Sequence, residues 1–268
     1  MSCDACKEIP PVSASYTEKG HYETFDGLKT YVTGPADATR AVIDIYDIFG
    51  FASQTLQGAD RLAEHMGGAL VLVPDLLDGS YAEHGWIPPD TPEKQRAFGR
   101  LLEGPANIQR AVGRLARVRA LLGERYPGVE GHVAVGGLCW GGKVAVLATG
   151  KGNEGAGRKF TRYVLSRLQE KHWELMVISL STSLLEAADA EALNVPHICL
   201  ASPDESADAV SQVKKVLSKP GKTGHVETYG RPMFHGWMGA RANLADEENA
   251  RQFERGYKQV ADFLAKYI

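Results

Sequence analysis

The chain has 268 residues, of which 44% are hydrophobic and 24% charged, as is ordinary for a soluble globular protein. The formal net charge of −3 gives no reason to expect nucleic acid or an anionic membrane as a partner. No apolar run approaches the roughly 18 residues of a membrane span, residues 1–11 do not resemble a secretory signal, and 4 cysteines are too few for a disulfide scaffold. We therefore expect a cytoplasmic protein.

The first half of the chain predicts a hairpin and then strands that alternate with helices. Residues 1–14 are expected to form a flexible tail, and residues 21–35 a β-hairpin with Asp26-Gly27 at its turn. In chain order we then expect a buried strand at 40–47, a helix from about 53 to 66, a second strand at 69–76, an exposed loop at 77–91 and a long helix at about 105–126.

The second half continues this alternation. Strands are predicted at 132–138, 175–180, 197–202 and 225–230, and the last helix at about 247–267. Continuous β-branched strands between amphipathic helices favour an α/β fold with a mostly parallel sheet covered on both faces. Residues 15–268 are expected to form a single domain.

A sharp turn is predicted between the strand at 132–138 and the following Ala/Val-rich helix. It reads Gly-Leu-Cys-Trp-Gly-Gly and has the Gly-x-nucleophile-x-Gly spacing of a nucleophile elbow, with Cys139 at its centre. Side chains at Gly137 and Gly141 would collide in such a turn, and a thiolate at Cys139 would lie at a helix N-terminus, which favours negative charge. The alternative is that Cys139 is a small buried apolar residue.

A thiol nucleophile requires a base and a group that orients the base. Proteins with this elbow carry nucleophile, acid and histidine in that order along the chain. Of the late histidines, His225 alternates within a predicted strand, whereas His235 lies in a glycine-flanked loop before the last helix. We expect His235 to be the base, the alternative being a surface histidine packed on Trp237.

The acid is expected just after the strand at 197–202, where the sequence offers Asp204, Glu205 and Asp208. Asp204 comes first, in a Ser-Pro-Asp turn, and is the preferred candidate, with Asp208 in reserve. The alternative for Asp204 is a cap on the helix that follows.

Five motifs together resemble the dienelactone hydrolase family, whose members include carboxymethylenebutenolidases. They are spread from about Asp44 to Trp237 and read DIFG (47–50), PDLLDG, GLCWGGKVA, ASPD and FHGW. The resemblance implies an α/β-hydrolase fold and a Cys-Asp-His triad of Cys139, Asp204 and His235. It also implies hydrolysis of a small-molecule ester or lactone, with an enol-lactone preference, and no metal or organic cofactor.

The resemblance assigns four further residues by position. Asp47 stands where the family has an acid that supports the nucleophile, although bacterial members have the longer glutamate there. Backbone N–H groups of Ile48 and Trp140 would form the oxyanion hole, and Arg241 is the nearest counterpart of a substrate-binding arginine. The alternatives are a strand-end residue bonded to the next loop for Asp47, and a solvated surface residue for Arg241.

Segment 158–182 departs from the family pattern, because residues 162–174 read as an additional basic helix and delay the next strand. Two other functions compete with hydrolysis: a redox-sensitive thiol protein that uses Cys139 and the Cys3-x-x-Cys6 pair, and an inactive hydrolase-fold scaffold. A lone Cys-x-x-Cys pair is a weak zinc or redox signal. We expect a monomer or homodimer, with no nucleic-acid or membrane partner.

Overall fold

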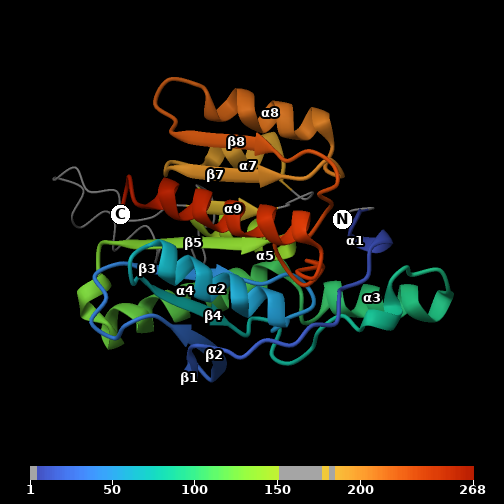
Figure 1. Ribbon diagram of the computed structural model, residues 1–268, viewed down its shortest axis with the longest axis horizontal. Helices are drawn as coiled ribbons and strands as arrows, with labels where there is room; N and C mark the ends of the chain where they lie inside the picture. The colour runs from blue at the N-terminus through green and yellow to red at the C-terminus, as the bar shows by residue number, and fades with distance from the viewer. Residues whose placement is uncertain (1–4, 151–176, 181–184) are drawn as a thin grey trace.

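The computed structural model describes residues 5–150, 177–180 and 185–268, and these form a layered arrangement around one eight-stranded sheet (Figure 1). The strand order is β1-β2-β4-β3-β5-β6-β7-β8. In chain order the strands are β1 His21–Phe25, β2 Leu28–Thr33, β3 Ala41–Ile45, β4 Leu70–Pro74, β5 Val133–Leu138, β6 Val177–Leu180, β7 His197–Ala201 and β8 Gly224–Thr228.

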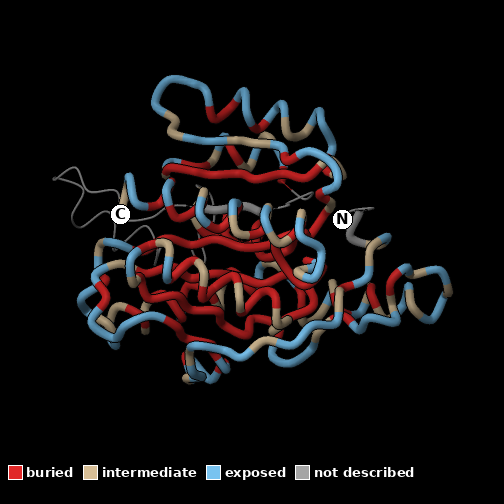
Figure 2. The backbone as a smooth tube through the Cα atoms, viewed as in Figure 1, coloured by how far each residue is buried: buried red, intermediate tan, exposed pale blue. Residues whose placement is uncertain are grey.

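The sheet is antiparallel at one edge and parallel elsewhere. The predicted hairpin forms β1 and β2, and both turn residues, Asp26 and Gly27, have positive φ, as its tight turn requires. Strand β2 pairs antiparallel with β4, and every later neighbour is parallel. Figure 2 shows the central strands as buried, which explains why β3, β4 and β5 are nearly all apolar.

Helices cover both faces of the sheet. Figure 1 shows α2 and α9 in front of the strands and α5 and α7 behind them, with α8 beside the β8 edge. The helices are α1 Ala5–Glu8, α2 Ser53–His65, α3 Pro92–Glu103, α4 Ile108–Arg125, α5 Trp140–Thr149, α7 Ala187–Ala192, α8 Ala207–Leu217 and α9 Glu247–Leu264, with short 3-10 turns at His84–Trp86 and Pro127–Val129. None of the helices in the described ranges is both long and apolar enough for a membrane span.

The parallel α/β architecture and the predicted strands are confirmed, with ends that differ by a few residues. Helix α3 was not predicted. Its start carries the expected signals, since Thr91 caps the N–H of Lys94 and Pro92 occupies the first turn, but its sequence is too polar for a clear apolar stripe.

Most of segment 158–182 lies outside the described residues, apart from β6. Residues 9–14 fall in the predicted flexible tail, yet they pack against the body of the protein: Pro11 is buried and Val12 N–H donates to the carbonyl of Ala240 at 2.9 Å.

Candidate active site

The turn between β5 and α5 has the geometry of a nucleophile elbow. Cys139 has φ 51° and ψ −112°, a backbone conformation that residues with a side chain rarely adopt. A Cβ at Gly137 would lie 2.4 Å from the carbonyl carbon of Gly141, and one at Gly141 would lie 2.3 Å from the carbonyl oxygen of Ile45. Both glycines are therefore required for the strand to turn so tightly into the helix. A strained residue held this firmly is typical of a functional site.

His235 lies against Cys139, which is 96 residues away in the chain. Its Nε2 is 3.2 Å from the Cys139 Sγ. Both side chains are shielded from solvent, with 0% of His235 and 2% of Cys139 exposed. The structure thus brings together the predicted thiol and the predicted base at hydrogen-bond distance.

The ring of His235 is oriented by Glu205 rather than by the preferred candidate Asp204. The Nδ1 atom of His235 lies 2.7 Å from Glu205 Oε1, and the other carboxylate oxygen of Glu205 accepts the N–H of Ser202. An ionised carboxylate only accepts hydrogen bonds, so Nδ1 carries the proton and Nε2 is left to face the thiol. The prediction that Asp204 orients the His235 ring is therefore wrong.

Asp204 instead holds the backbone of the same histidine. Its Oδ2 accepts the N–H of His235 at 2.8 Å, and its Oδ1 lies 2.7 Å from the exposed guanidinium of Arg231. The cap of α8 is Ser206, whose hydroxyl accepts the N–H of Ala209, and the reserve candidate Asp208 lies exposed in the first turn of that helix. The adjacent acids therefore fix different parts of His235.

Asp47 follows β3 and is completely buried. Its Oδ1 accepts the N–H of Phe49 at 2.9 Å, and its Oδ2 accepts the N–H of Ala240 at 3.2 Å. Burial raises the pKa of Asp47, and the charge of Arg241, these two N–H groups and His235 oppose that rise. The carboxylate thus joins the loop after β3 to the loop that carries His235, while its predicted contact with Cys139 stays a prediction.

The two residues assigned to the oxyanion hole are each adjacent in the chain to another predicted site residue. Ile48 lies between Asp47 and Phe49, and Trp140 begins α5 directly after Cys139. Neither backbone N–H donates a hydrogen bond to another residue of the described ranges. The Trp140 side chain is fixed by its indole N–H, which donates to the carbonyl of Ala106 at 2.8 Å.

Arg241 is not a solvated surface residue, because none of it is exposed. Its Nε donates to the carbonyl of Ile9, and its guanidinium carbon lies 4.8 Å from the centre of the Phe49 ring. In this conformation the side chain contacts the N-terminal segment of the protein and an aromatic ring, and it has no surface exposed to solvent. Its predicted role in substrate binding stays a prediction.

A cavity of about 620 Å³ borders Phe49. Its walls come from Phe49 after β3, from residues 79–86 after β4, and from α3 together with Pro105. The aromatic side chains Tyr81 and Trp86 and the cation Arg100 are among them. The unpredicted helix α3 therefore forms one side of the cavity that borders Phe49.

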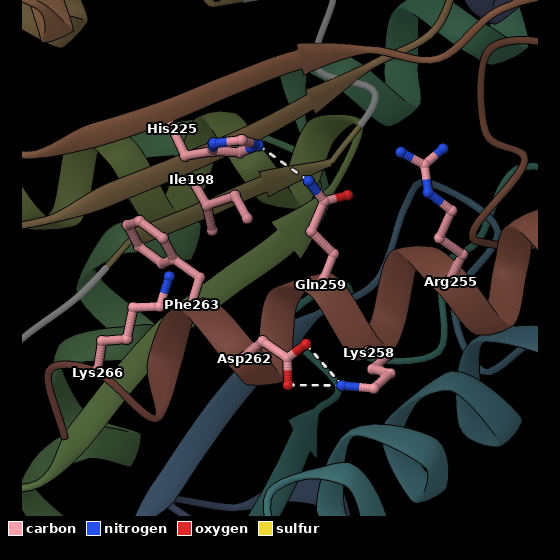
Figure 3. Close-up of a pocket in the computed structure, with 8 residues that line it drawn as sticks. All are labelled: Ile198, His225, Arg255, Lys258, Gln259, Asp262, Phe263 and Lys266. Carbon is pink, nitrogen blue, oxygen red and sulfur yellow. Dashed lines mark hydrogen bonds and ion pairs between the residues drawn. The ribbon is translucent and has the colours of Figure 1, made fainter.

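A second cavity, of about 420 Å³, lies between α9 and the strands β7 and β8 (Figure 3). It contains none of the predicted site residues. His225 lines it, on β8 as predicted, and its ring contacts Gln259 at 2.9 Å. In the parts of the chain that the structure describes, no group of three or more His, Cys, Asp or Glu is placed to hold a metal ion.

Comparisons with known proteins agree with this architecture. The sequence profile of the dienelactone hydrolase family matches residues 28–268. An uncharacterized AIM2 family protein of Schizosaccharomyces pombe is 32% identical over 265 residues, covering 97% of this chain and 96% of that protein.

Solved structures share the fold. The dienelactone hydrolase of Anabaena variabilis superposes with a TM-score of 0.60 at 14% identity, covering 94% of this chain and 98% of that one. A dienelactone hydrolase-like promiscuous phosphotriesterase from metagenomic libraries gives 0.61 at 16% identity, with the same coverage of 94% and 98%. The fold is that of the α/β-hydrolases, and the chain belongs to the dienelactone hydrolase family.

Proposed function

We propose that this protein hydrolyses a small carboxylic ester or lactone through a thioester on Cys139. The observation that carries the proposal is the chain of short contacts from Glu205 to His235 Nδ1, at 2.7 Å, and from His235 Nε2 to Cys139 Sγ, at 3.2 Å. These are the roles of acid, base and nucleophile in a hydrolytic triad.

In the first half of the reaction, Cys139 loses its proton to His235 Nε2 and the thiolate attacks the substrate carbonyl carbon. Glu205 stabilises the imidazolium that forms, because its carboxylate accepts a hydrogen bond from the Nδ1–H group. The N–H groups of Ile48 and Trp140 are the proposed donors to the oxyanion of the tetrahedral intermediate. Its collapse breaks the ester C–O bond, the imidazolium protonates the leaving oxygen, and the acyl group stays on sulfur.

In the second half, His235 removes a proton from water, and the resulting hydroxide attacks the thioester carbonyl. The carbon–sulfur bond then breaks, the acid product leaves, and Cys139 regains its proton from His235. A thiolate is itself readily expelled from a tetrahedral intermediate, so acylation proceeds best when the other leaving group is at least as good. Enolates and phenolates meet this condition, so enol lactones and activated esters are the preferred substrates.

The cavity beside Phe49 is the proposed substrate pocket. It opens where β3 and β4 end, at the same edge of the sheet as the elbow after β5. Tyr81 and Trp86 offer it planar apolar surfaces, which suit an unsaturated or aromatic acyl group.

Steady-state hydrolysis of p-nitrophenyl acetate tests the proposal with the variant Cys139→Ala. We expect turnover to fall to the rate of the uncatalysed reaction. The matched control is Cys199→Ala, which removes the buried thiol of β7 and should retain turnover. Undiminished hydrolysis by Cys139→Ala would exclude the nucleophile, whereas no hydrolysis by the wild-type protein of activated esters or enol lactones would favour the redox-sensitive thiol or the inactive scaffold.

A further inference from the structure

The segment of residues 9–14, here called the N-terminal strap, lies at the active-site edge of the sheet. Figure 1 shows α1, which directly precedes the strap, at the end to which the arrows of β7 and β8 point. The elbow cysteine and the loop that carries His235 follow strands at that same end.

The strap is bonded to the loop that follows His235. Val12 N–H donates to the carbonyl of Ala240 at 2.9 Å. The buried amide of Gln54 donates both to the carbonyl of Val12 at 2.8 Å and to the carbonyl of Ala242 at 3.1 Å. Ile9 supplies the carbonyl that accepts the Nε of Arg241. These bonds hold residues 240–242 against the strap and against α2.

Two of these loop residues, Ala240 and Arg241, also contact the loop after β3. Ala240 N–H donates to Asp47 Oδ2, and the guanidinium of Arg241 lies over the ring of Phe49. Asp47 and Phe49 are the two neighbours of Ile48, the proposed oxyanion donor. Residues 240 and 241 therefore lie between the strap and the loop that presents this N–H group.

The strap also supplies a hydrogen-bond acceptor to a buried cation, Arg241. Arg241 is fully buried, and a buried guanidinium needs acceptors to offset its lost hydration. The Ile9 carbonyl supplies one. Without the strap, Arg241 would lose this acceptor.

We infer that the N-terminal strap is a positioning element of the active site, which sets the geometry of both the His235 loop and the Ile48 loop through Ala240 and Arg241. The inference rests on the proposed function for its kinetic consequence. It assigns Arg241 to positioning, in place of direct contact with the substrate. It also predicts that substitutions in the strap slow the chemical step, although the bonds that join the strap to the loop are made to Ala240 and Arg241 and not to Cys139 or His235.

The variant Val12→Pro tests the inference in the full-length protein, because proline lacks the N–H that Ala240 accepts. We expect kcat for p-nitrophenyl acetate to fall about tenfold or more, since small displacements of catalytic groups are costly, while KM changes by less than about twofold. Ser15→Pro is the matched control: it introduces the same residue at an exposed position outside the strap, and kcat should be unchanged.

A second readout does not depend on turnover. The rate at which iodoacetamide labels Cys139, followed by peptide mass spectrometry across pH, reports how well His235 is placed to accept the thiol proton. In Val12→Pro we expect the half-maximal rate at a higher pH than in the wild-type protein and in Ser15→Pro. The variant Gln54→Met, which removes both amide bonds at similar length, should move kcat and labelling in the same directions and serves if Val12→Pro does not fold.

The two readouts separate this inference from the proposed function. If the wild-type protein hydrolyses no ester but the labelling profile moves in Val12→Pro or Gln54→Met, the strap positions the site and the proposed function fails. If kcat and the labelling profile of Val12→Pro and of Gln54→Met equal those of Ser15→Pro, the inference is overturned, whatever the activity of the wild type.

Discussion

Glu205 and Asp204 hold one histidine from two sides: Glu205 Oε1 lies 2.7 Å from the ring nitrogen of His235, and Asp204 Oδ2 lies 2.8 Å from its backbone nitrogen. These adjacent residues of the turn after β7 thus fix both the tautomer of the imidazole and the position of the loop that bears it. The consequences of losing each carboxylate should differ.

The variant Glu205→Gln should lower kcat by about 1,000-fold or more, because the neutral amide can neither enforce the reactive tautomer nor stabilise an imidazolium. Asp204→Asn keeps an oxygen that can accept the His235 N–H and loses mainly the contact with the exposed Arg231, so we expect a loss of less than about tenfold. Steady-state kinetics on an activated ester compares the two. Equal losses, or a larger loss in Asp204→Asn, would restore Asp204 as the residue that orients the base.

The elbow should not tolerate a methyl group at Gly141. In Gly141→Ala the new Cβ would meet the carbonyl oxygen of Ile45 at 2.3 Å. That oxygen belongs to the backbone and cannot move aside. We expect a loss of about 3 kcal/mol in the free energy of unfolding, or loss of the folded protein, measured by urea denaturation and soluble yield. Gly99→Ala is the control, since its Cβ has open space on α3 and should be neutral or stabilising by up to about 1 kcal/mol.

Asp44 on β3 predicts a pH-dependent stability. Burial raises its pKa to about 7, and its Oδ2 has no hydrogen-bond partner among the described residues. The folded protein therefore binds a proton at Asp44 that the unfolded chain releases near pH 4. The contribution of this group is most favourable below about pH 4 and is lost as the pH rises to about 7.

The variant Asp44→Asn cannot ionise and should lack this loss. Between pH 5 and pH 8 we expect its free energy of unfolding to improve relative to the wild type by about 3 kcal/mol, since about 1.4 kcal/mol is lost from the wild type for each pH unit below the pKa. Urea denaturation at the two pH values measures this difference and cancels the pH-independent cost of the amide. A difference between variant and wild type that is the same at both pH values would show that Asp44 is not protonated in the folded protein.

Lys143 on α5 and Asp189 on α7 form an ion pair of 2.6 Å with 7% and 10% of their side chains exposed. Removing the cation in Lys143→Met leaves the carboxylate buried without its counter-charge, so we expect a loss of about 3–5 kcal/mol in the free energy of unfolding. The control Lys258→Met breaks an exposed pair with Asp262 and should cost less than about 1 kcal/mol. Similar losses in the two variants in urea denaturation would contradict this account.

Much of the fold could be predicted from the sequence, because its signals are local. The apolar runs of β3, β4 and β5 and the stripe of α9 depend on which residues lie within a few positions of one another. The elbow could be read for the same reason, since two glycines around one residue and the flanking strand and helix lie within a dozen positions. Helix α3 escaped prediction because few of its residues are buried, so its sequence resembles an exposed loop.

The choice of acid could not be read from the sequence, because Asp204 and Glu205 are neighbours and their direction depends on the turn after β7. Glutamate has the additional methylene that lets Glu205 reach both the His235 ring and the Ser202 N–H. The contact of Arg241 with the N-terminal segment could not be predicted either, since its partner Ile9 lies 232 positions earlier in the chain. Contacts at such separation leave no periodic trace in one sequence.

The central claim is a thioester on Cys139, and acid quenching of the protein during turnover of p-nitrophenyl acetate, followed by peptide mass spectrometry, tests it most directly. We predict one acetyl group on the peptide that contains Cys139, released by hydroxylamine and absent from Cys139→Ala. Continued turnover with Cys139 unmodified, or with the acetyl group on another residue, would contradict the account.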